Sequence, residues 1–512
     1  MKVRPQGILV LDYGSQYTLL IARRLREAGF YTEIHPSDHK CPEHFDVRGI
    51  ILSGGPDSIH KGGRMLAPWV LQSALPVLGI CYGMQLLVSE LGGEVIEADH
   101  REFGGAMMRW EETAAQSFHK DLPEKHQVWM SHGDEVRVDD QVWSVAARTL
   151  AGIAAAVVHK SLPVYGLQFH PEVEHTEYGV DLLINFAQNV CLSAKDWSAT
   201  KWHESISEEI REQVGDGHVL VAVSGGVDSS VMALLLLRAL GTERVHAVLV
   251  DHGMMRAGEI EHVGALLKEQ GLRLTIMEEK DRFFSQLKGV ADPEKKRKII
   301  GHAFIECFEE FAKDLPITHL GQGTLYPDVI ESAAHGSGAG VIKSHHNVGG
   351  LPENLQFELV EPLRFLFKDE VRVVGRELGL PDHMVDRHPF PGPGLGIRIP
   401  GEVDEEKANI LRAADAIFIQ ALRDEGYYNQ VWQAGVVLLP VKSVGVMGDQ
   451  RTREWTAVLR AVDAVDAMTA YPSPLSLEFL NQVAGQIVSR VRGVNRVLYD
   501  VTSKPPATIE WE

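Results

Sequence analysis

Residues 76–85 have the sequence PVLGICYGMQ, and residues 219–230 have the sequence VLVAVSGGVDSS. Each segment begins with a short apolar run, passes through a turn that contains glycine, and continues with apolar residues at helical spacing. A buried strand followed by a tight turn and a helix is the repeating unit of domains with parallel sheets. The two segments therefore predict an α/β fold with two successive parallel-sheet domains.

The sequence around both segments repeats this alternation. Apolar runs at 8–11 and 49–52 precede the first segment, and the run 245–250 follows the second, before a helix expected at 259–270. The chain has 512 residues, and a single core stops growing at about 250–300 residues. We predict three domains, which span residues 1–195, 196–385 and 386–512.

The last part of the chain has a different pattern. After the proline- and glycine-rich segment 389–394, amphipathic helices are expected at 405–425 and 477–492. Strand-like runs at 436–439 and 496–501 lie between and after these helices. We therefore expect the third domain to be a smaller α+β domain.

Composition and charge exclude several classes of function. With 50 basic and 70 acidic residues, the formal net charge is −20, which argues against nucleic acid as a partner. No apolar stretch reaches the roughly 18 residues of a membrane span, so we expect no membrane partner. The four cysteines are widely spaced and form no C-x-x-C pair, which favours neither a disulfide framework nor a zinc site. A reducing, cytoplasmic location fits this composition best.

Cys81 lies at the turn of the first segment. A nucleophile at such a turn projects from the carboxyl end of the sheet, beside a helix amino terminus whose dipole favours the thiolate. The sequence LQFHPE at 167–172 supplies His170 and, two residues later, Glu172. An imidazole and a carboxylate are the partners that a thiolate nucleophile needs. We predict a catalytic triad of Cys81, His170 and Glu172; the alternative is a buried core cysteine and a histidine that only ends a strand.

Together, the strings GICYGMQ and QFHPE resemble the signatures of the class I glutamine amidotransferases, over about residues 7–190. The resemblance implies that Cys81 attacks the carboxamide of glutamine, forms a thioester and releases ammonia. It also implies that backbone N–H groups hold the tetrahedral oxyanion, and that Gln85 helps to bind glutamine. The residues implied in the oxyanion site are Gly54 and Gly55 of the loop 53–56, and Tyr82.

The turn of the second segment is suited to binding phosphate. Its glycines let backbone N–H groups converge on phosphate oxygens, its serine hydroxyls add donors, and the helix that follows adds positive potential. Asp228 is placed to hold Mg²⁺ against the phosphates. A plain strand-to-helix turn with serine and aspartate caps is the alternative. The predicted ATP-binding residues are Ser224, Gly225, Gly226, Val227, Asp228, Ser229 and Ser230, with Val250 at the end of the next strand.

This loop lacks the G-K-[ST] of a P-loop and resembles the S-G-G-x-D-S loop of the ATP pyrophosphatases, whose domains have the adenine-nucleotide α-hydrolase fold. The resemblance implies that ATP transfers AMP to a carbonyl-type oxygen and leaves an adenylylated intermediate open to a nucleophile. A glutaminase on the same chain would supply ammonia as that nucleophile. The cofactors implied are ATP and Mg²⁺.

The whole chain resembles the glutamine-hydrolysing GMP synthases, which convert xanthosine 5′-monophosphate (XMP) to GMP with release of AMP and pyrophosphate. The strings that carry this resemblance are KIIG (298–301), GQGTLYPD (321–328), SHHN (344–347), RHPFPGPGL (387–395), VGVMGD (444–449) and KPPATIEWE (504–512). The resemblance implies that the third domain forms a homodimer. Its implied XMP-binding residues are Arg297, Gln433, Lys504 and Glu510.

Two further expectations concern single segments. Lys368 resembles a lid lysine that neutralises charge on ATP during adenylyl transfer, with a solvated helix lysine as the alternative. The prolines of the carboxyl-terminal segment stiffen it, and Ile509 and Trp511 offer apolar anchors, so we expect this tail to be docked.

Other functions compatible with these motifs are an ATP pyrophosphatase with a different acceptor, such as an NAD synthase or a tRNA thiolase, and a non-catalytic nucleotide-sensing scaffold. An NAD synthase would normally carry a glutaminase of the nitrilase type, and a tRNA enzyme would show a basic surface. A scaffold should have lost Cys81, His170 or Asp228, and all three are present.

Overall fold

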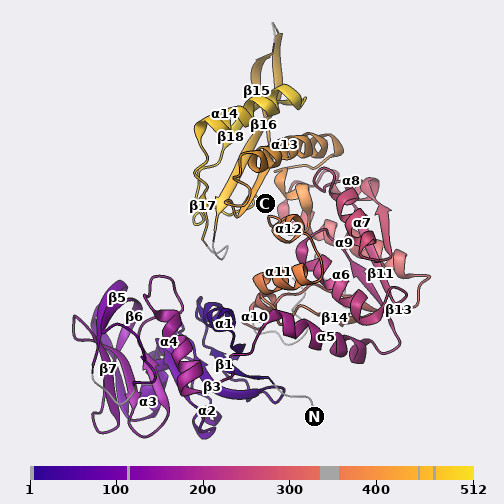
Figure 1. The fold of residues 1–512 in the computed structure, drawn as a ribbon. Helices are drawn as coiled ribbons and strands as arrows, with labels where there is room; N and C mark the ends of the chain where they lie inside the picture. Colours follow the sequence, from indigo (N-terminus) through magenta and orange to yellow (C-terminus); the bar gives the residue numbers. More distant parts are fainter. Residues whose placement is uncertain (1–4, 112–115, 335–356, 448–449, 465–468) are drawn as a thin grey trace. The chain divides into compact units, whose positions relative to one another are not determined.

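The structure is a computed structural model that describes residues 5–111, 116–334, 357–447, 450–464 and 469–512 (Figure 1). The chain divides into two compact units. Met1–Trp202 belongs to the first unit, and His203–Val329 and Gly338–Glu512 belong to the second. The boundaries expected near residues 195 and 385 stay predictions.

In the described part of the first unit, nine strands form one sheet in the order β2-β1-β3-β4-β9-β8-β7-β5-β6. The first five strands in this order are parallel. The strands are β1 (Gln6–Asp12), β2 (Tyr31–Pro36), β3 (Asp46–Leu52), β4 (Val77–Ile80), β5 (Gly93–Trp110), β6 (Lys125–Val138), β7 (Trp143–Thr149), β8 (Ala154–His159) and β9 (Val164–Leu167). The helices include α1 (Thr18–Glu27), α2 (Pro68–Gln72), α3 (Tyr82–Glu90) and α4 (Gly179–Asn185).

The other half of this sheet is antiparallel, a feature that the sequence analysis did not specify. Strands β5 and β6 are long, and the burial of β6 alternates along much of its length. Such alternation is typical of antiparallel strands with one solvated face. The parallel half, which carries both predicted catalytic motifs, is as expected.

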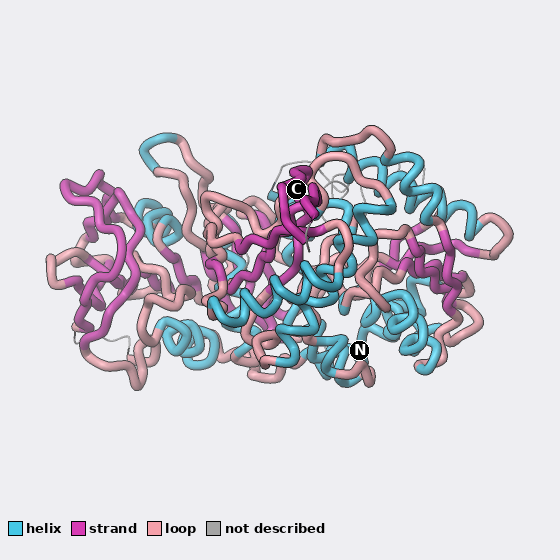
Figure 2. The backbone as a smooth tube through the Cα atoms, turned by 90° about the horizontal axis from the view of Figure 1, so that it is seen from above, coloured by secondary structure: helices cyan, strands magenta, loops and turns pink. Residues whose placement is uncertain are grey.

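In the second unit, the described residues include a five-stranded parallel sheet with the order β12-β11-β10-β13-β14. Its strands are β10 (His218–Ala222), β11 (Val245–Asp251), β12 (Leu274–Glu278), β13 (Ile317–Gly321) and β14 (Glu358–Val360). The helices around it are α5 (Ala199–Val214), α6 (Val227–Leu240), α7 (Glu259–Glu269), α8 (Lys280–Leu287), α9 (Pro293–Ala312), α10 (Tyr326–Ala334), α11 (Lys368–Glu377) and α12 (Asp382–Val385). Figure 2 shows helices on both sides of these strands. Helix α6 is apolar on nearly every face and mostly buried, as its sequence requires.

The rest of the second unit is an α+β region, as predicted. Its described strands are β15 (Gln433–Met447), β16 (Gln450–Asp463), β17 (Tyr471–Pro472) and β18 (Val494–Tyr499), with helices α13 (Glu405–Asp424) and α14 (Leu477–Arg490). Strands β15 and β16 form an antiparallel hairpin, and β18 is parallel to β16. Figure 1 shows this hairpin extending beyond α13 and α14.

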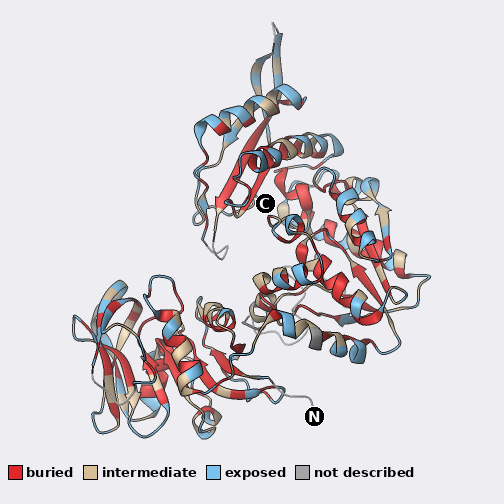
Figure 3. Ribbon diagram, viewed as in Figure 1, coloured by how far each residue is buried: buried red, intermediate tan, exposed pale blue. Residues whose placement is uncertain are grey.

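One hydrophobic core joins the parallel sheet to the α+β region. It contains Leu220 and Val248 of the sheet together with Phe418 and Val436 of the α+β region. Figure 3 shows buried residues concentrated in the strands of both. The two predicted domains of this unit therefore pack as one body. Within the described residues, no helix combines the length and apolarity that crossing a membrane requires.

Candidate active sites

Cys81 lies at a sharp turn between β4 and α3. Its φ of 49° and ψ of −106° fall outside the regions that non-glycine residues favour, a kind of strain that is often found at catalytic nucleophiles. A Cβ atom on Gly79 would lie 2.5 Å from the backbone of Gly83, and one on Gly83 would lie 2.5 Å from the carbonyl oxygen of Leu52. The glycines therefore make this turn possible, and the turn places the thiol at the carboxyl end of the parallel strands.

His170 follows β9, and its ring contacts a buried carboxylate. Its Nδ1 atom lies 2.7 Å from Oε1 of Glu172, and the two side chains are 5% and 0% exposed. Burial lowers the pKa of His170, but the charge of Glu172 and hydrogen bonds with Cys81 and Glu172 outweigh burial, so the pKa lies well above its usual value. The structure thus brings the three residues of the predicted triad together, with the imidazole contacting both partners.

The predicted oxyanion loop follows β3 and lies against the same site. A Cβ atom on Gly54 would lie 3.0 Å from Cε1 of His170 and 3.6 Å from Cβ of Cys81. Gly55 packs so closely against the backbone after β1 that a Cβ atom could not fit. Tyr82 is the first residue of α3 and directly follows the nucleophile. The loop and the start of α3 therefore meet at the thiol.

Strand β6, and Gln168 after β9, supply contacts that the motifs did not predict. The Sγ atom of Cys81 lies 3.7 Å from the carbonyl oxygen of Ser131, and the Nε2 atom of Gln168 lies 3.9 Å from the same sulfur. The side-chain amide of Gln85 donates a hydrogen bond to the carbonyl oxygen of Asp134 at 3.3 Å. The run of polar residues inside β6 is a sequence signal for the contacts of Ser131 and Asp134, but this run matches no motif.

The predicted phosphate loop connects β10 to α6. Gly225 has a φ of +79°, in the region that favours glycine. The hydroxyls of Ser224 and Ser229 lie 3.1 Å apart, and the hydroxyl of Ser230 donates to the carbonyl oxygen of Gly226 at 2.9 Å. The serines therefore brace the loop at the amino terminus of a long buried helix, where an anion binds most favourably.

The strand order places this loop where ligands bind in such sheets. The order reverses at β10, which has β11 on one side and β13 on the other. Ligand sites in open parallel sheets lie outside the carboxyl ends of the strands at such a reversal. Val250 is buried one residue before the end of β11, so it lies on the strand beside the loop.

Asp228 and Lys368 meet at the loop from different parts of the chain. The Nζ atom of Lys368, the first residue of α11, lies 3.4 Å from Oδ2 of Asp228. The Oδ1 atom of Asp228 is buried and has no hydrogen-bond partner among the described residues. The site thus presents one ammonium group and one carboxylate oxygen available for a further ligand.

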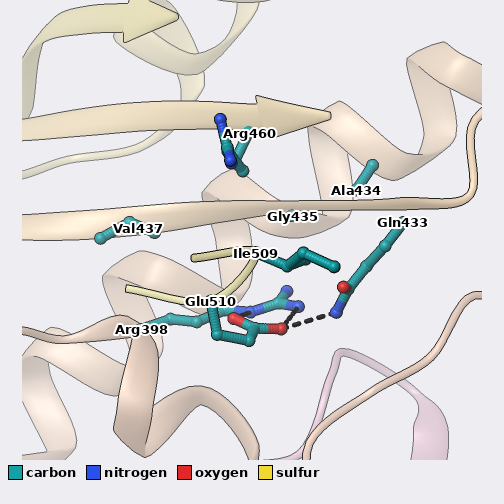
Figure 4. A pocket seen from close by; sticks show the side chains of 8 residues that line it. All are labelled: Arg398, Gln433, Ala434, Gly435, Val437, Arg460, Ile509 and Glu510. Carbon is teal, nitrogen blue, oxygen red and sulfur yellow. Dashed lines mark hydrogen bonds and ion pairs between the residues drawn. The ribbon is translucent and has the colours of Figure 1, made fainter. Parts of the chain in front are cut away.

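Two of the predicted XMP-binding residues are in direct contact (Figure 4). The side-chain amide of Gln433 donates to Oε1 of Glu510 at 2.6 Å. The guanidinium of Arg398 donates to both oxygens of Glu510, at 3.0 and 2.7 Å. Burial raises the pKa of Glu510, but the charge of Arg398 outweighs it, so the pKa lies below its usual value. The small cavity at these residues has room for about one water molecule.

Of the other two predicted XMP-binding residues, Arg297 contacts the same tail and Lys504 belongs to it. Arg297 on α9 donates to the main-chain oxygen of Glu512 at 2.6 Å, and the neighbouring Lys296 is paired with the Glu512 carboxylate. Lys504 lies at the start of the tail, where its backbone is paired with that of Ala470. The tail is therefore docked, as expected.

The apolar anchors that we expected for the tail are a weaker part of its docking. Trp511 is 40% exposed, and Ile509 is only partly buried. The carboxylates of Glu510 and Glu512 make the buried contacts instead, because basic side chains of the second unit surround them. Charge complementarity thus fixes the tail more than apolar burial does.

Sequence motifs also missed a group of arginines around Phe390. The guanidinium carbons of Arg256, Arg387 and Arg398 lie 4.8, 5.9 and 5.3 Å from the centre of its ring. Arg387 begins the string at 387–395 and Arg398 follows it closely, but the string by itself indicates no role for either. Of the other strings, SHHN at 344–347 and residues 448–449 of VGVMGD lie outside the described residues.

Three known families match separate stretches of the chain. The family described as glutamine amidotransferase class-I matches residues 9–190, the family described as NAD synthase matches 199–299, and the family described as GMP synthase C terminal domain matches 420–511. Curated proteins named GMP synthase [glutamine-hydrolyzing] match along the whole chain. The protein of Fusobacterium nucleatum is 51% identical over 511 residues, with 99% of each chain covered. That of Rhizobium etli is 52% identical over 516 residues, with 99% of each chain covered.

The chain belongs to the family of glutamine-hydrolysing GMP synthases. The resemblance that the sequence motifs indicated is therefore confirmed. The solved structure of one GMP synthase subunit from Thermoplasma acidophilum is 32% identical with a TM-score of 0.32, covering 38% of this chain and 96% of that chain. The NAD synthase family matches only residues 199–299, within the ATP-pyrophosphatase part of the chain, while residues 420–511 match the family described as GMP synthase C terminal domain.

Proposed function

We propose that the chain aminates XMP to GMP, with ammonia from glutamine and with ATP as the activating nucleotide. The products are GMP, glutamate, AMP and pyrophosphate. The observation that carries this proposal is full-length similarity to glutamine-hydrolysing GMP synthases in a chain that holds both a thiol–imidazole–carboxylate site and a glycine-rich phosphate loop.

Glutamine hydrolysis follows from the geometry around Cys81. The thiolate attacks the carboxamide carbon, and the oxyanion is held by backbone N–H groups of the loop with Gly54 and Gly55 and by that of Tyr82. The raised pKa of His170 keeps a proton on the imidazole, which it donates to the leaving nitrogen, so that ammonia departs and a thioester remains. Water then hydrolyses the thioester to glutamate, with His170 accepting the proton of the water and Glu172 orienting the ring.

ATP activates the acceptor at the phosphate loop. The acceptor oxygen attacks the α-phosphorus, the bond to the β-phosphate breaks, and pyrophosphate leaves. Ammonia then attacks the activated carbon, and AMP leaves with the oxygen. The loop residues 224–230 hold the phosphates, and Lys368 balances the charge that develops on them. Val250, on the neighbouring strand, contributes to the adenosine side of the site.

Mg²⁺ fits this loop as a cofactor. The buried Oδ1 atom of Asp228, which has no partner among the described residues, suits a hard cation. Mg²⁺ in nucleotide sites is held by one or two carboxylates together with phosphates and water, which agrees with a single carboxylate at this position. When bound, the ion neutralises phosphate charge.

The acceptor site lies where the tail meets the second unit. Arg297 and Lys504 suit the phosphate of XMP, and Gln433 and Glu510 suit N–H and hydroxyl groups of its base and ribose. Docking of the tail by Arg398 supports this assignment, because it holds Glu510 and Gln433 in one place.

A homodimer through the α+β region completes the proposal. Val441, Val444 and Val446 of β15 are 56%, 64% and 73% exposed. Val444 and Val446 lie two positions apart on the strand, so they share an exposed apolar face that a second copy can cover. We place the enzyme in the cytoplasm, since its four cysteines are free and a reducing compartment keeps them so.

Product analysis tests the proposed function. The purified chain is incubated with ATP, Mg²⁺, glutamine and XMP, and the nucleotides are separated and identified. We expect GMP and AMP in equal amounts. Formation of ADP would contradict the pyrophosphatase assignment, and amination of a nicotinate dinucleotide instead of XMP would favour an NAD synthase activity.

A further inference from the structure

Arg387 follows α12 and reaches the phosphate loop from 162 residues away. Its Nη1 atom donates a hydrogen bond to the carbonyl oxygen of Gly225 at 2.7 Å. Its Nη2 atom is paired with the carboxylate of Glu259. The two side chains are 14% and 4% exposed, so the contact is largely shielded from water. One guanidinium thus binds the loop and a buried anchor at the same time.

The anchor is itself fixed. Glu259 is the first residue of α7, and its Oε2 atom accepts a hydrogen bond from the backbone N–H of Arg256 at 3.0 Å. The ring of Phe390 flanks the Arg387 guanidinium on another side. Arg387 therefore has little freedom to move away from the loop, because its partners belong to a helix end and to a packed ring.

The loop is packed directly against this pair. A Cβ atom on Gly225 would lie 3.2 Å from Oε1 of Glu259 and 3.4 Å from Nη1 of Arg387. The peptide between Gly225 and Gly226 is planar, so its C=O and N–H groups point in opposite directions. A donor that holds the Gly225 oxygen on one side therefore turns the Gly226 N–H toward the other side, where the serines of the loop lie.

Arg387 keeps its charge in this environment. Burial, and to a smaller extent the charge of Arg256, lower the pKa of Arg387 to about 10. This value is still well above neutral pH, so the guanidinium remains protonated and its hydrogen bond to the loop is charge-assisted.

We propose that Arg387 is a positioning residue of the ATP site, which holds the Gly225 peptide so that the loop's N–H groups face the phosphates of ATP. This inference rests on the proposed function of the phosphate loop. Arg387 contacts no reacting atom; it acts through the Gly225–Gly226 peptide. This positioning role requires both Nη atoms of the guanidinium, one on the loop and one on Glu259, and not only a positive charge.

The variant Arg387→Lys separates these two properties, because lysine keeps the charge and cannot bridge Gly225 and Glu259 at once. Initial rates are measured on the full chain with ammonium chloride as nitrogen donor, which makes the assay independent of glutamine hydrolysis. We expect the KM for ATP to rise about tenfold, the effect of one charge-assisted hydrogen bond, while the KM for XMP changes less than about twofold. Unchanged KM values for ATP would overturn the proposal.

Arg376→Lys is the matched control. Arg376 on α11 also bridges two acceptors, Asp382 and Asp386, but it is more exposed and neither acceptor belongs to the phosphate loop. It should leave the KM for ATP unchanged. An equal rise in both variants would mean that any arginine of this region has the effect, and would also overturn the proposal.

A second variant guards against loss of folding. Arg387→Met with Glu259→Gln removes both charges, so no buried charge is left without its partner. ATP binding is then measured directly by calorimetry, which needs no turnover. About tenfold weaker binding supports the proposal, and wild-type affinity contradicts it. If the wild-type chain bound ATP but formed no AMP with XMP, the proposed function would fail while the role of Arg387 in ATP binding would still be decided.

Discussion

The Nδ1 atom of His170 lies 2.7 Å from the Oε1 atom of Glu172, and both side chains are buried. Burial alone would lower the pKa of His170, so its raised value depends on its neighbours, above all on Glu172. The imidazole consequently carries a proton over a wider pH range than a free histidine. Of the contacts that raise the pKa of His170, that with Glu172 has the largest effect.

Glu172→Gln should therefore move the alkaline limb of glutamine hydrolysis to lower pH and reduce its rate by about 10²–10⁴-fold. Protonated His170 also stabilises the fold, and this stabilisation is likewise lost at high pH. Because the folded pKa of His170 is raised, its stabilising contribution is complete below the usual pKa of about 6.5 and is lost as pH rises through the folded value. The rate of glutamate release across pH measures the effect on glutamine hydrolysis. The free energy of unfolding in urea at about pH 6 and pH 9 measures the effect on stability. A pH profile that coincides with the wild type would contradict this role of Glu172.

Asp228→Asn should reduce GMP synthesis by about 10²-fold or more with either glutamine or ammonium as donor, since the carboxylate at the phosphates is gone. Hydrolysis of glutamine should persist, because Asp228 lies in the other unit. Asp281→Asn, at an exposed position in the first turn of α8, is the control and should retain activity. Retained synthesis in Asp228→Asn would remove this residue from the ATP site.

Glu510→Gln should raise the KM for XMP about tenfold and leave the KM for ATP nearly unchanged, because it removes one charged acceptor from the proposed acceptor site. Arg398 keeps Asp415 as a partner at 3.5 Å, and Glu512 of the tail stays paired with Lys296, so the tail should remain docked. Glu478→Gln, on the exposed side of α14, serves as the control. Equal KM values for XMP in all three proteins would place the acceptor elsewhere.

Replacing both Val444 and Val446 by lysine should convert a dimer to a monomer, since charges then face each other on the apolar side of β15. Light scattering coupled to gel filtration reports the mass of each protein. Leu150→Lys, at an exposed apolar residue of the first unit, should not change the mass. A dimer that survives both valine substitutions would place the interface on another surface.

The elements that the sequence predicted well are those with a strong local signal. The apolar run that begins the segment 219–230 is β10, His218–Ala222, and the helix expected at 405–425 is α13, Glu405–Asp424. Strand β10 is set by its apolar run and the glycines after it. Helix α13 is set by apolar spacing and by a cap, because Asp404 accepts a hydrogen bond from the backbone of Lys407. Such signals act over a few residues and depend little on the tertiary structure around them.

Other elements depend on residues far apart in the chain. The strand expected at 436–439 extends over Gln433–Met447, because its outer half alternates exposed valine with polar residues and is ordered by pairing with β16. The antiparallel half of the first sheet escaped prediction for the same reason, since long hairpins are stabilised by cross-strand pairs and not by one continuous apolar run.

The residues of the candidate sites also divide into those with a local sequence signal and those that only the fold brings together. Cys81 and His170 could be found because each lies at a strand end in a recognisable string. The contact of Arg387 with Gly225 joins residues 162 positions apart, and that of Arg398 with Glu510 joins residues 112 positions apart. No local pattern predicts such pairs; the fold creates them.

The central claim is that one chain holds two chemically separate centres, a thiol that frees ammonia and a nucleotide site that consumes it. GMP formation by Cys81→Ala, measured in parallel with glutamine and with ammonium chloride, tests this claim most directly. We predict that GMP formation from glutamine is lost, while formation from ammonium equals that of the wild type. Equal loss with both nitrogen donors would contradict the separation of the two centres.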